Sequence, residues 1–109
     1  AGANVEAPGK FGWTPLMVSA QVSMERVTRT LLEAGAALET QDVYGRTALT
    51  CSAINGSERV TTLLVEAEAR LEAQDMDGET ALMWAARFGK KEVCELLVHK
   101  KATIKAIKN

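Results

Sequence analysis

Apolar and small residues recur along this chain at intervals of 33 positions. The recurring positions are Leu16, Leu49 and Leu82; Ala20, Ala53 and Ala86; Val27, Val60 and Val93; Leu31, Leu64 and Leu97; and Ala36, Ala69 and Ala102. Their spacing within each interval gives one buried stripe to each of two helices. A fixed period of this length is typical of arrays in which each unit packs only on its neighbours. The pattern therefore predicts a short array of helical units.

Each unit opens on the same short motif, a glycine followed two residues later by threonine and four residues later by leucine. The motif begins at Gly12, Gly45 and Gly78. A glycine can end a turn with positive φ, and the threonine is placed to cap a helix. We expect helices over residues 15–22, 24–34, 48–55, 57–67, 81–88 and 91–100. Between them, residues 39–45 and 73–78 should form fingers, with Asp42 near the first tip.

These features together closely resemble the ankyrin repeat. The resemblance implies an all-α ankyrin-repeat solenoid of antiparallel helix pairs joined by β-hairpin-like fingers. It implies one domain over residues 1–109, with a partial repeat at 1–11 and repeats at 12–44, 45–77 and 78–109. Two departures matter. The histidine that follows the leucine in the family is absent, and the glycine after the second helix survives at Gly35 but is replaced by Glu68 and Lys101. A non-glycine residue held there in a left-handed turn would cost about 1 kcal/mol.

The stacking logic also makes a prediction about the two ends of the array. An end unit lacks a neighbour on one side, so apolar side chains around Val27 and Leu31, and around Val93, Leu96 and Ile104, should be poorly covered. Exposed apolar patches promote association. We therefore expect self-association through uncapped ends, or a place within a longer array.

Composition indicates an ordinary globular domain. Hydrophobic residues make up 47% of the chain and charged residues 25%, with no apolar run near the roughly 18 residues of a membrane helix, so we expect no membrane insertion. Cys51 and Cys94 fall at different places in the repeat, which favours reduced core thiols and an intracellular (cytoplasmic or nuclear) setting. The net charge of −1 hides an asymmetry, because residues from Arg87 onward carry seven basic and two acidic side chains.

The inventory of reactive groups does not favour catalysis. His99 is the single histidine and falls at the exposed end of a helix. No pair of cysteines or histidines has the spacing of zinc ligands, and no glycine-rich loop is placed to hold a phosphate. The carboxylates have solvated positions on loops and fingers. We therefore expect neither an enzyme nor a bound cofactor or metal.

Aromatic residues give the candidate binding site. Trp84 shares its register with Val18 and Cys51, so we expect it in the core. The other four aromatic residues take positions that line the concave groove of fingers and first helices in the family. Neighbouring groove positions complete the predicted site, which consists of Phe11, Trp13, Gln21, Val22, Val43, Tyr44, Arg46, Ile54, Asn55, Met76, Asp77, Glu79, Arg87 and Phe88. Aromatic and arginine side chains dominate many interfaces, so the predicted partner is a protein or peptide.

Three alternatives remain open. The aromatic residues could instead pack on the neighbouring repeat and stiffen the fingers, Trp13 above all. The chain could be a purely structural segment of a longer array. It could also read a basic or methyl-lysine peptide, since aromatic faces with carboxylates suit a cation. That site would use Phe11, Trp13 and Tyr44 with Asp42, Asp77 and Glu79. Nucleic-acid binding is not expected, because the aromatic residues lie mostly away from the basic end.

Overall fold

The structure is a computed structural model that describes residues 9–108, and for residues 102–108 the backbone alone. Most of the predicted partial repeat, residues 1–8, lies outside the described residues. The elements in chain order are η1 (Lys10–Gly12), α1 (Pro15–Gln21), α2 (Glu25–Glu33), α3 (Ala48–Asn55), α4 (Glu58–Glu66), α5 (Ala81–Arg87) and α6 (Lys91–Lys108). Every predicted helix except α6 agrees with its observed bounds to within one residue at each end.

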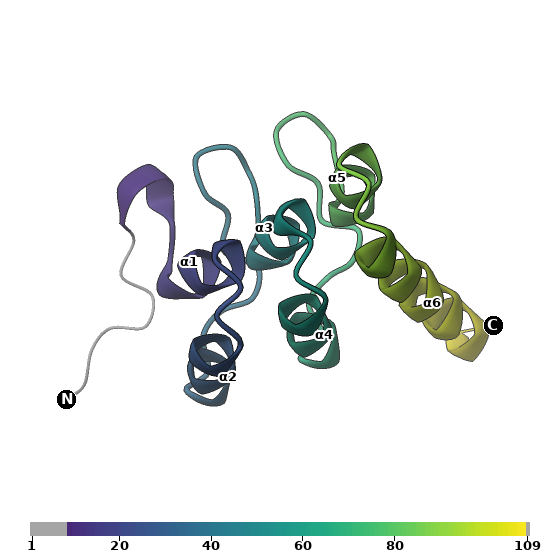
Figure 1. The fold of residues 1–109 in the computed structure, drawn as a ribbon, viewed down its shortest axis with the longest axis horizontal. Coiled ribbons are helices and arrows are strands. Elements are labelled where there is room, and N and C mark those ends of the chain that lie inside the picture. Colours follow the sequence, from purple (N-terminus) through teal and green to yellow (C-terminus); the bar gives the residue numbers. More distant parts are fainter. Residues whose placement is uncertain (1–8, 109) are drawn as a thin grey trace.

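The helices form two parallel rows. Figure 1 shows α1, α3 and α5 side by side in one row and α2, α4 and α6 in the other, with the connecting fingers projecting beyond the first row. Each helix contacts its partner within a pair and its neighbours along its row. The principal extents of 43, 27 and 22 Å describe an elongated array. The part of the chain that is described contains no strand, so the fingers are turns and the solenoid is all-α as predicted.

The first helix of every pair begins at the predicted threonine. The side chains of Thr14, Thr47 and Thr80 each accept a hydrogen bond from the backbone N–H three residues further on. These bonds satisfy one of the helix's unpaired N-terminal donors, a contribution of about 1 kcal/mol per cap. The shared motif therefore fixes the same helix start in all three pairs.

The core is built mainly from the recurring apolar positions, among them the fully buried Leu16, Leu49 and Leu64. Two buried hydroxyl pairs were not apparent from the apolar pattern. The hydroxyl oxygens of Ser19 and Thr28 lie 2.8 Å apart, and those of Ser52 and Thr61 lie 2.9 Å apart. Each pair joins the two helices of one repeat, and the serine also donates to a backbone carbonyl, so these buried polar groups are satisfied.

The prediction of uncovered ends is right for Val27 at the N-terminal end and wrong for Val93 at the C-terminal end, and Leu31 and Leu96 are both half-buried. Val27 is 43% exposed, whereas the equivalent Val60 and Val93 are fully buried. Because Val93 is buried in the last described pair and Val27 is exposed in the first, this position faces the preceding helix pair. Val27 therefore has no neighbouring pair to pack on among the described residues, while Val93 has one. The side chain of Ile104 lies outside the described residues.

The last helix differs most from the sequence prediction. We expected it to end near residue 100, but α6 continues to Lys108 and passes straight through Lys101. At the two equivalent positions the chain does turn, with φ of 84° at Gly35 and 73° at Glu68. Lys101 lies inside α6 and therefore does not adopt the left-handed turn. Glu68, in contrast, carries the predicted conformational strain.

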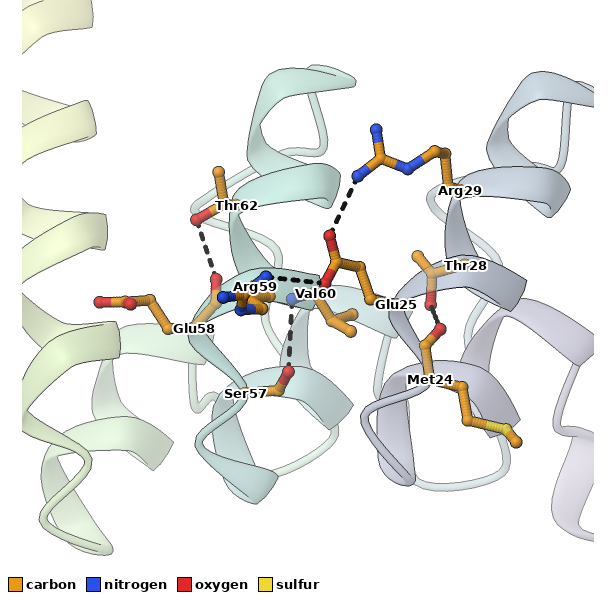
Figure 2. Close-up of polar contacts among 9 residues, drawn as sticks. All are labelled: Met24, Glu25, Thr28, Arg29, Ser57, Glu58, Arg59, Val60 and Thr62. Atoms are coloured by element: carbon orange, nitrogen blue, oxygen red, sulfur yellow. Dashed lines mark hydrogen bonds and ion pairs between the residues drawn. The ribbon is translucent and has the colours of Figure 1, made fainter.

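Exposed ion pairs lie on the row formed by α2, α4 and α6, which we call the outer row. Figure 2 shows Glu25 of α2 between Arg29 of the same helix, at 3.0 Å, and Arg59 of α4, at 3.3 Å. Pairs this exposed contribute little to stability. No helix in the described residues is both long and apolar enough to cross a membrane.

Candidate partner-binding surface

If the turn at η1 (Lys10–Gly12) is counted as the first finger, the second finger, residues 39–45, is organised by a buried aspartate. Asp42 is only 6% exposed, and its Oδ1 accepts hydrogen bonds from the backbone N–H groups of Tyr44 at 2.8 Å and Arg46 at 2.9 Å. Its own N–H donates to the carbonyl of Arg46, at 3.0 Å. Asp42 is therefore a structural carboxylate, because its hydrogen bonds fix the backbone of the finger.

The third finger, residues 73–78, repeats this arrangement around Asp75. We expected this carboxylate to be solvated, but it is buried. Its Oδ1 accepts from the N–H groups of Asp77 at 2.9 Å and Glu79 at 3.0 Å. Burial alone would raise the pKa of Asp75. Hydrogen bonds from the backbone of Glu79, the indole of Trp84 and the backbone of Asp77, together with the charge of Arg46, outweigh burial and hold the pKa below its ordinary value.

Backbone hydrogen bonds join each finger to the next. The N–H of Val43 donates to the carbonyl of Phe11 at 2.9 Å, and the N–H of Met76 donates to the carbonyl of Tyr44 at 3.0 Å. The approach is closest at Gly45, where an added Cβ would lie 2.8 Å from the nitrogen of Met76. Any side chain there would push the fingers apart. The three fingers therefore act as one connected surface.

Two tryptophan side chains complete the coordination of the aspartates. Trp13 Nε1 donates to Asp42 Oδ2 at 2.9 Å, and Trp84 Nε1 donates to Asp75 Oδ2 at 2.7 Å. Trp13 approaches from the preceding finger, whereas Trp84 approaches from α5. The prediction that Trp84 lies in the core is wrong, because its ring is half-buried beneath the fingers. Of the two equivalent residues, Cys51 is buried but Val18 is 44% exposed, so the register does not require burial, and the indole N–H of Trp84 needs a polar partner.

The aromatic rings and guanidinium groups form a continuous series across the fingers. We name this series the aromatic–cation ladder, and it consists of Phe11, Trp13, Tyr44, Arg46, Trp84, Arg87 and Phe88. Ring centroids lie 6.4 Å apart for Phe11 and Trp13, 6.2 Å for Phe11 and Tyr44, and 5.7 Å for the stacked Trp84 and Phe88. Arg46 Cζ lies 5.1 Å from the ring of Tyr44 and 5.3 Å from that of Trp84. Arg87 Cζ lies 5.0 Å from the ring of Trp84.

Three aromatic side chains of this ladder are about half exposed to solvent. Phe11 is 46% exposed, Tyr44 49% and Phe88 51%. Trp13 is half-buried and bonded to Asp42, which matches the stiffening role left open above. Exposed aromatic side chains in contact with one another are the residue types that anchor protein interfaces.

Of the remaining predicted residues, Glu79 contacts the ladder through Arg87, and the others lie at helix ends and finger tips. Val22 is exposed after the last turn of α1, Gln21 and Ile54 are half-buried near helix ends, and Asn55 bonds to Ser23 of the preceding repeat. At the finger tips, Val43 is 52% exposed and Met76 78% exposed, and Asp77 is exposed beside Met76.

Charges on the ladder are unequally paired. Arg87 forms an ion pair with Glu79 at 3.0 Å. Arg46 has no hydrogen bond or ion pair to a carboxylate among the residues the structure describes, and its buried Nε has no hydrogen-bond partner there. One guanidinium is thus neutralised while the other is held between rings.

Reactive groups elsewhere do not assemble into a site. Burial and the nearby Asp42 carboxylate raise the pKa of the Cys51 thiol to about 12, against a smaller opposing effect of Arg46, so the thiol stays protonated. Cys51 and Cys94 are both free thiols. Within residues 9–108, no group of three or more potential metal ligands gathers in one place. His99 is exposed on α6.

Trp84 is the site residue that sequence reasoning missed. Its register with Cys51 suggested burial, and the useful contrary signal was Phe88, one helical turn later on α5. Residues four apart lie on the same helix face, so an exposed Phe88 favours a Trp84 that reaches the same surface.

Comparison with known proteins gives one family. A family model described as ankyrin repeats (3 copies) matches residues 1–75 and, in an overlapping match, residues 36–108. No curated protein matches the chain.

Proposed function

Because the chain belongs to the ankyrin-repeat family, we propose that it is a scaffold or adaptor module that binds a protein or peptide partner in the concave groove formed by its fingers and first helices. Repeats of this family generally serve as non-catalytic protein–protein interaction modules. The observation that carries the proposal is the aromatic–cation ladder. Three of its rings, those of Phe11, Tyr44 and Phe88, remain about half exposed although they are held in place by one another and by the fingers.

The position of the rings supports binding over simple packing. The helix pairs already bury their own apolar stripes, so Tyr44 and Phe88 add exposed surface without completing the core. Their backbones are fixed by the finger hydrogen bond of Tyr44 and the C-terminal cap of α5 at Phe88. Preorganised anchors lose little conformational freedom on binding, which favours affinity.

The test compares wild-type protein with Tyr44→Ala and Phe88→Ala in affinity capture from a lysate, followed by affinity measurement with any partner found. We expect each change to weaken binding by about 1–3 kcal/mol while thermal unfolding stays close to wild type. Arg59→Ala on α4, whose side chain is 80% exposed on the outer row, is the matched control and should bind normally.

Two outcomes would count against this function. Unfolding of both variants would mean that the rings are structural. Full retention of the partner by both variants would mean that the array is a spacer, or binds through another face.

A further inference from the structure

The ladder presents its cations and carboxylates to solvent unequally. The oxygens of Asp42 and Asp75 accept three hydrogen bonds each from within the protein, and Glu79 is paired with Arg87. Arg46 has no such carboxylate partner among the residues described. The charge of Arg46 helps to lower the pKa of Asp75, but no hydrogen bond joins the two side chains. The surface therefore has one guanidinium without a carboxylate partner, next to carboxylates that already accept hydrogen bonds or form an ion pair.

The guanidinium of Arg46 is also held in position. It lies between the rings of Tyr44 and Trp84, with its Nε buried. A guanidinium fixed by ring contacts has already lost much of its rotamer freedom, so a hydrogen-bonding partner need not supply that ordering. Its planar donors match the geometry of a carboxylate.

Cations of the protein itself already lie over three of the five rings of the ladder, those of Phe11, Tyr44 and Trp84. Lys10 Nζ lies 5.2 Å from the ring of Phe11, and Arg46 and Arg87 lie over the rings of Tyr44 and Trp84. A lysine or methyl-lysine from a partner would compete with these cations at all three rings. The contacts therefore favour the opposite charge on the partner.

We infer that the partner docks through an acidic segment, in which a glutamate or aspartate pairs with Arg46 while a neighbouring apolar side chain packs on the exposed rings of Phe11 and Tyr44. This inference rests on the proposed function and adds the chemical class of the partner.

A polyphosphate chain fits the same surface less well. Nucleic-acid affinity grows with the number of phosphates that cations neutralise. Arg46 of the ladder and the neighbouring Lys10 are available, but Arg87 is paired and Asp77 is exposed on the adjacent finger. Residues 1–86 also carry twelve acidic against six basic side chains. An acidic peptide needs only one such cation, and its apolar side chains can use the rings.

The experiment selects displayed random dodecapeptides against the folded wild-type protein, Arg46→Gln and Arg59→Gln. Arg59→Gln makes the same charge change on the outer row and serves as the matched control. We expect wild type and Arg59→Gln to enrich peptides with an acidic residue next to an aromatic or aliphatic one, and Arg46→Gln to lose this preference. Far-ultraviolet circular dichroism checks that each variant is folded, and Arg46→Lys supplies a second variant that keeps the charge without the planar fork.

A selected peptide then tests the pairing directly by fluorescence anisotropy. Replacing its acidic residue by the amide, or replacing Arg46 by Gln, should weaken binding by roughly ten- to a hundredfold, and both together should cost little more than either. Arg46→Lys should fall in between. Affinity should decrease as salt is raised, because the pair is partly exposed.

Other results would overturn the inference while leaving the proposed function intact. These are selection of neutral or basic peptides that still depend on Tyr44, tighter binding of a trimethyl-lysine peptide than of its glutamate counterpart, displacement of the peptide by oligothymidine, or acidic peptides indifferent to Arg46→Gln. A library that yields no binder overturns the peptide assignment, and the capture experiment then judges the function separately. Binding that ignores both Tyr44→Ala and Arg46→Gln would contradict the proposed surface itself.

Discussion

The indole N–H of Trp13 donates a hydrogen bond to Asp42 Oδ2, 2.9 Å away on the following finger. The other oxygen of Asp42 closes the finger by accepting two backbone N–H groups. One carboxylate thus connects the fold of its own finger to the position of its neighbour. The same logic recurs at Asp75 with Trp84, so the fingers are held by two buried aspartates and two indoles.

Trp13→Phe should remove this link while keeping the aromatic ring. We expect the free energy of unfolding to fall by about 1–3 kcal/mol, because Asp42 Oδ2 would lose its indole donor in a buried setting. Urea unfolding of Trp13→Phe, Asp42→Asn and the double variant measures the coupling between the two side chains. Costs that simply add would show that the hydrogen bond contributes nothing.

The lowered pKa of Asp75 predicts how stability depends on pH. The pKa is lower in the folded than in the unfolded state, so the ionised carboxylate stabilises the fold above about pH 4, and this contribution is lost as the pH falls through the folded-state pKa. Asp75→Asn should therefore be less stable than wild type at neutral pH, with a difference that shrinks in acid. Asp77→Asn, at an exposed position, is the control. A stability gap for Asp75→Asn that stays constant down to acid pH would show that its ionisation is not involved.

Leu64→Ala should be among the most damaging single changes. Leu64 is fully buried in α4, which has helix pairs on both sides, so we expect a loss of about 2–5 kcal/mol. Leu31 occupies the same place in the first repeat but is only half-buried, and Leu31→Ala should cost clearly less. Denaturant unfolding measures both. Equal losses would contradict the picture of a stack in which cover comes from neighbours.

Glu68→Gly should raise stability, because Glu68 holds a φ of 73° in a turn that glycine adopts without strain. The expected gain is up to about 1 kcal/mol, since the greater freedom of glycine in the unfolded chain offsets part of the relief. Glu66→Gly, at the last residue of α4, is the control and should lower stability. If both variants lose stability alike in thermal unfolding, the turn at Glu68 is not strained.

The helix pairs and their caps were predictable from sequence because equivalent residues make the same contacts in each repeat. Thr14, Thr47 and Thr80 cap their helices in the same way, and a single register therefore predicts all three. The exposed rings of Tyr44 and Phe88 followed from the same register.

The features that were missed depend on contacts between repeats. The sequence indicates only that Asp42 lies near a finger tip. Its structural role becomes clear from the hydrogen bonds that it accepts from Trp13 and two backbone N–H groups. Trp84 shares a register with buried Cys51, yet its indole N–H needs a hydrogen-bond partner. The extension of α6 to Lys108 places Lys101 inside a helix, whereas its register with Gly35 and Glu68 had predicted a turn.

Site-specific photocrosslinking tests the central claim, that the aromatic–cation ladder is where a partner binds. A photoreactive phenylalanine analogue would replace Tyr44 or Phe88 on the ladder, or Arg59 on the outer row, and each protein would be irradiated in a lysate. We predict that the Tyr44 and Phe88 positions crosslink the same partner, that excess unlabelled wild-type protein suppresses the product, and that the Arg59 position does not form it. A product that forms from Arg59 but from neither ladder position would contradict the account.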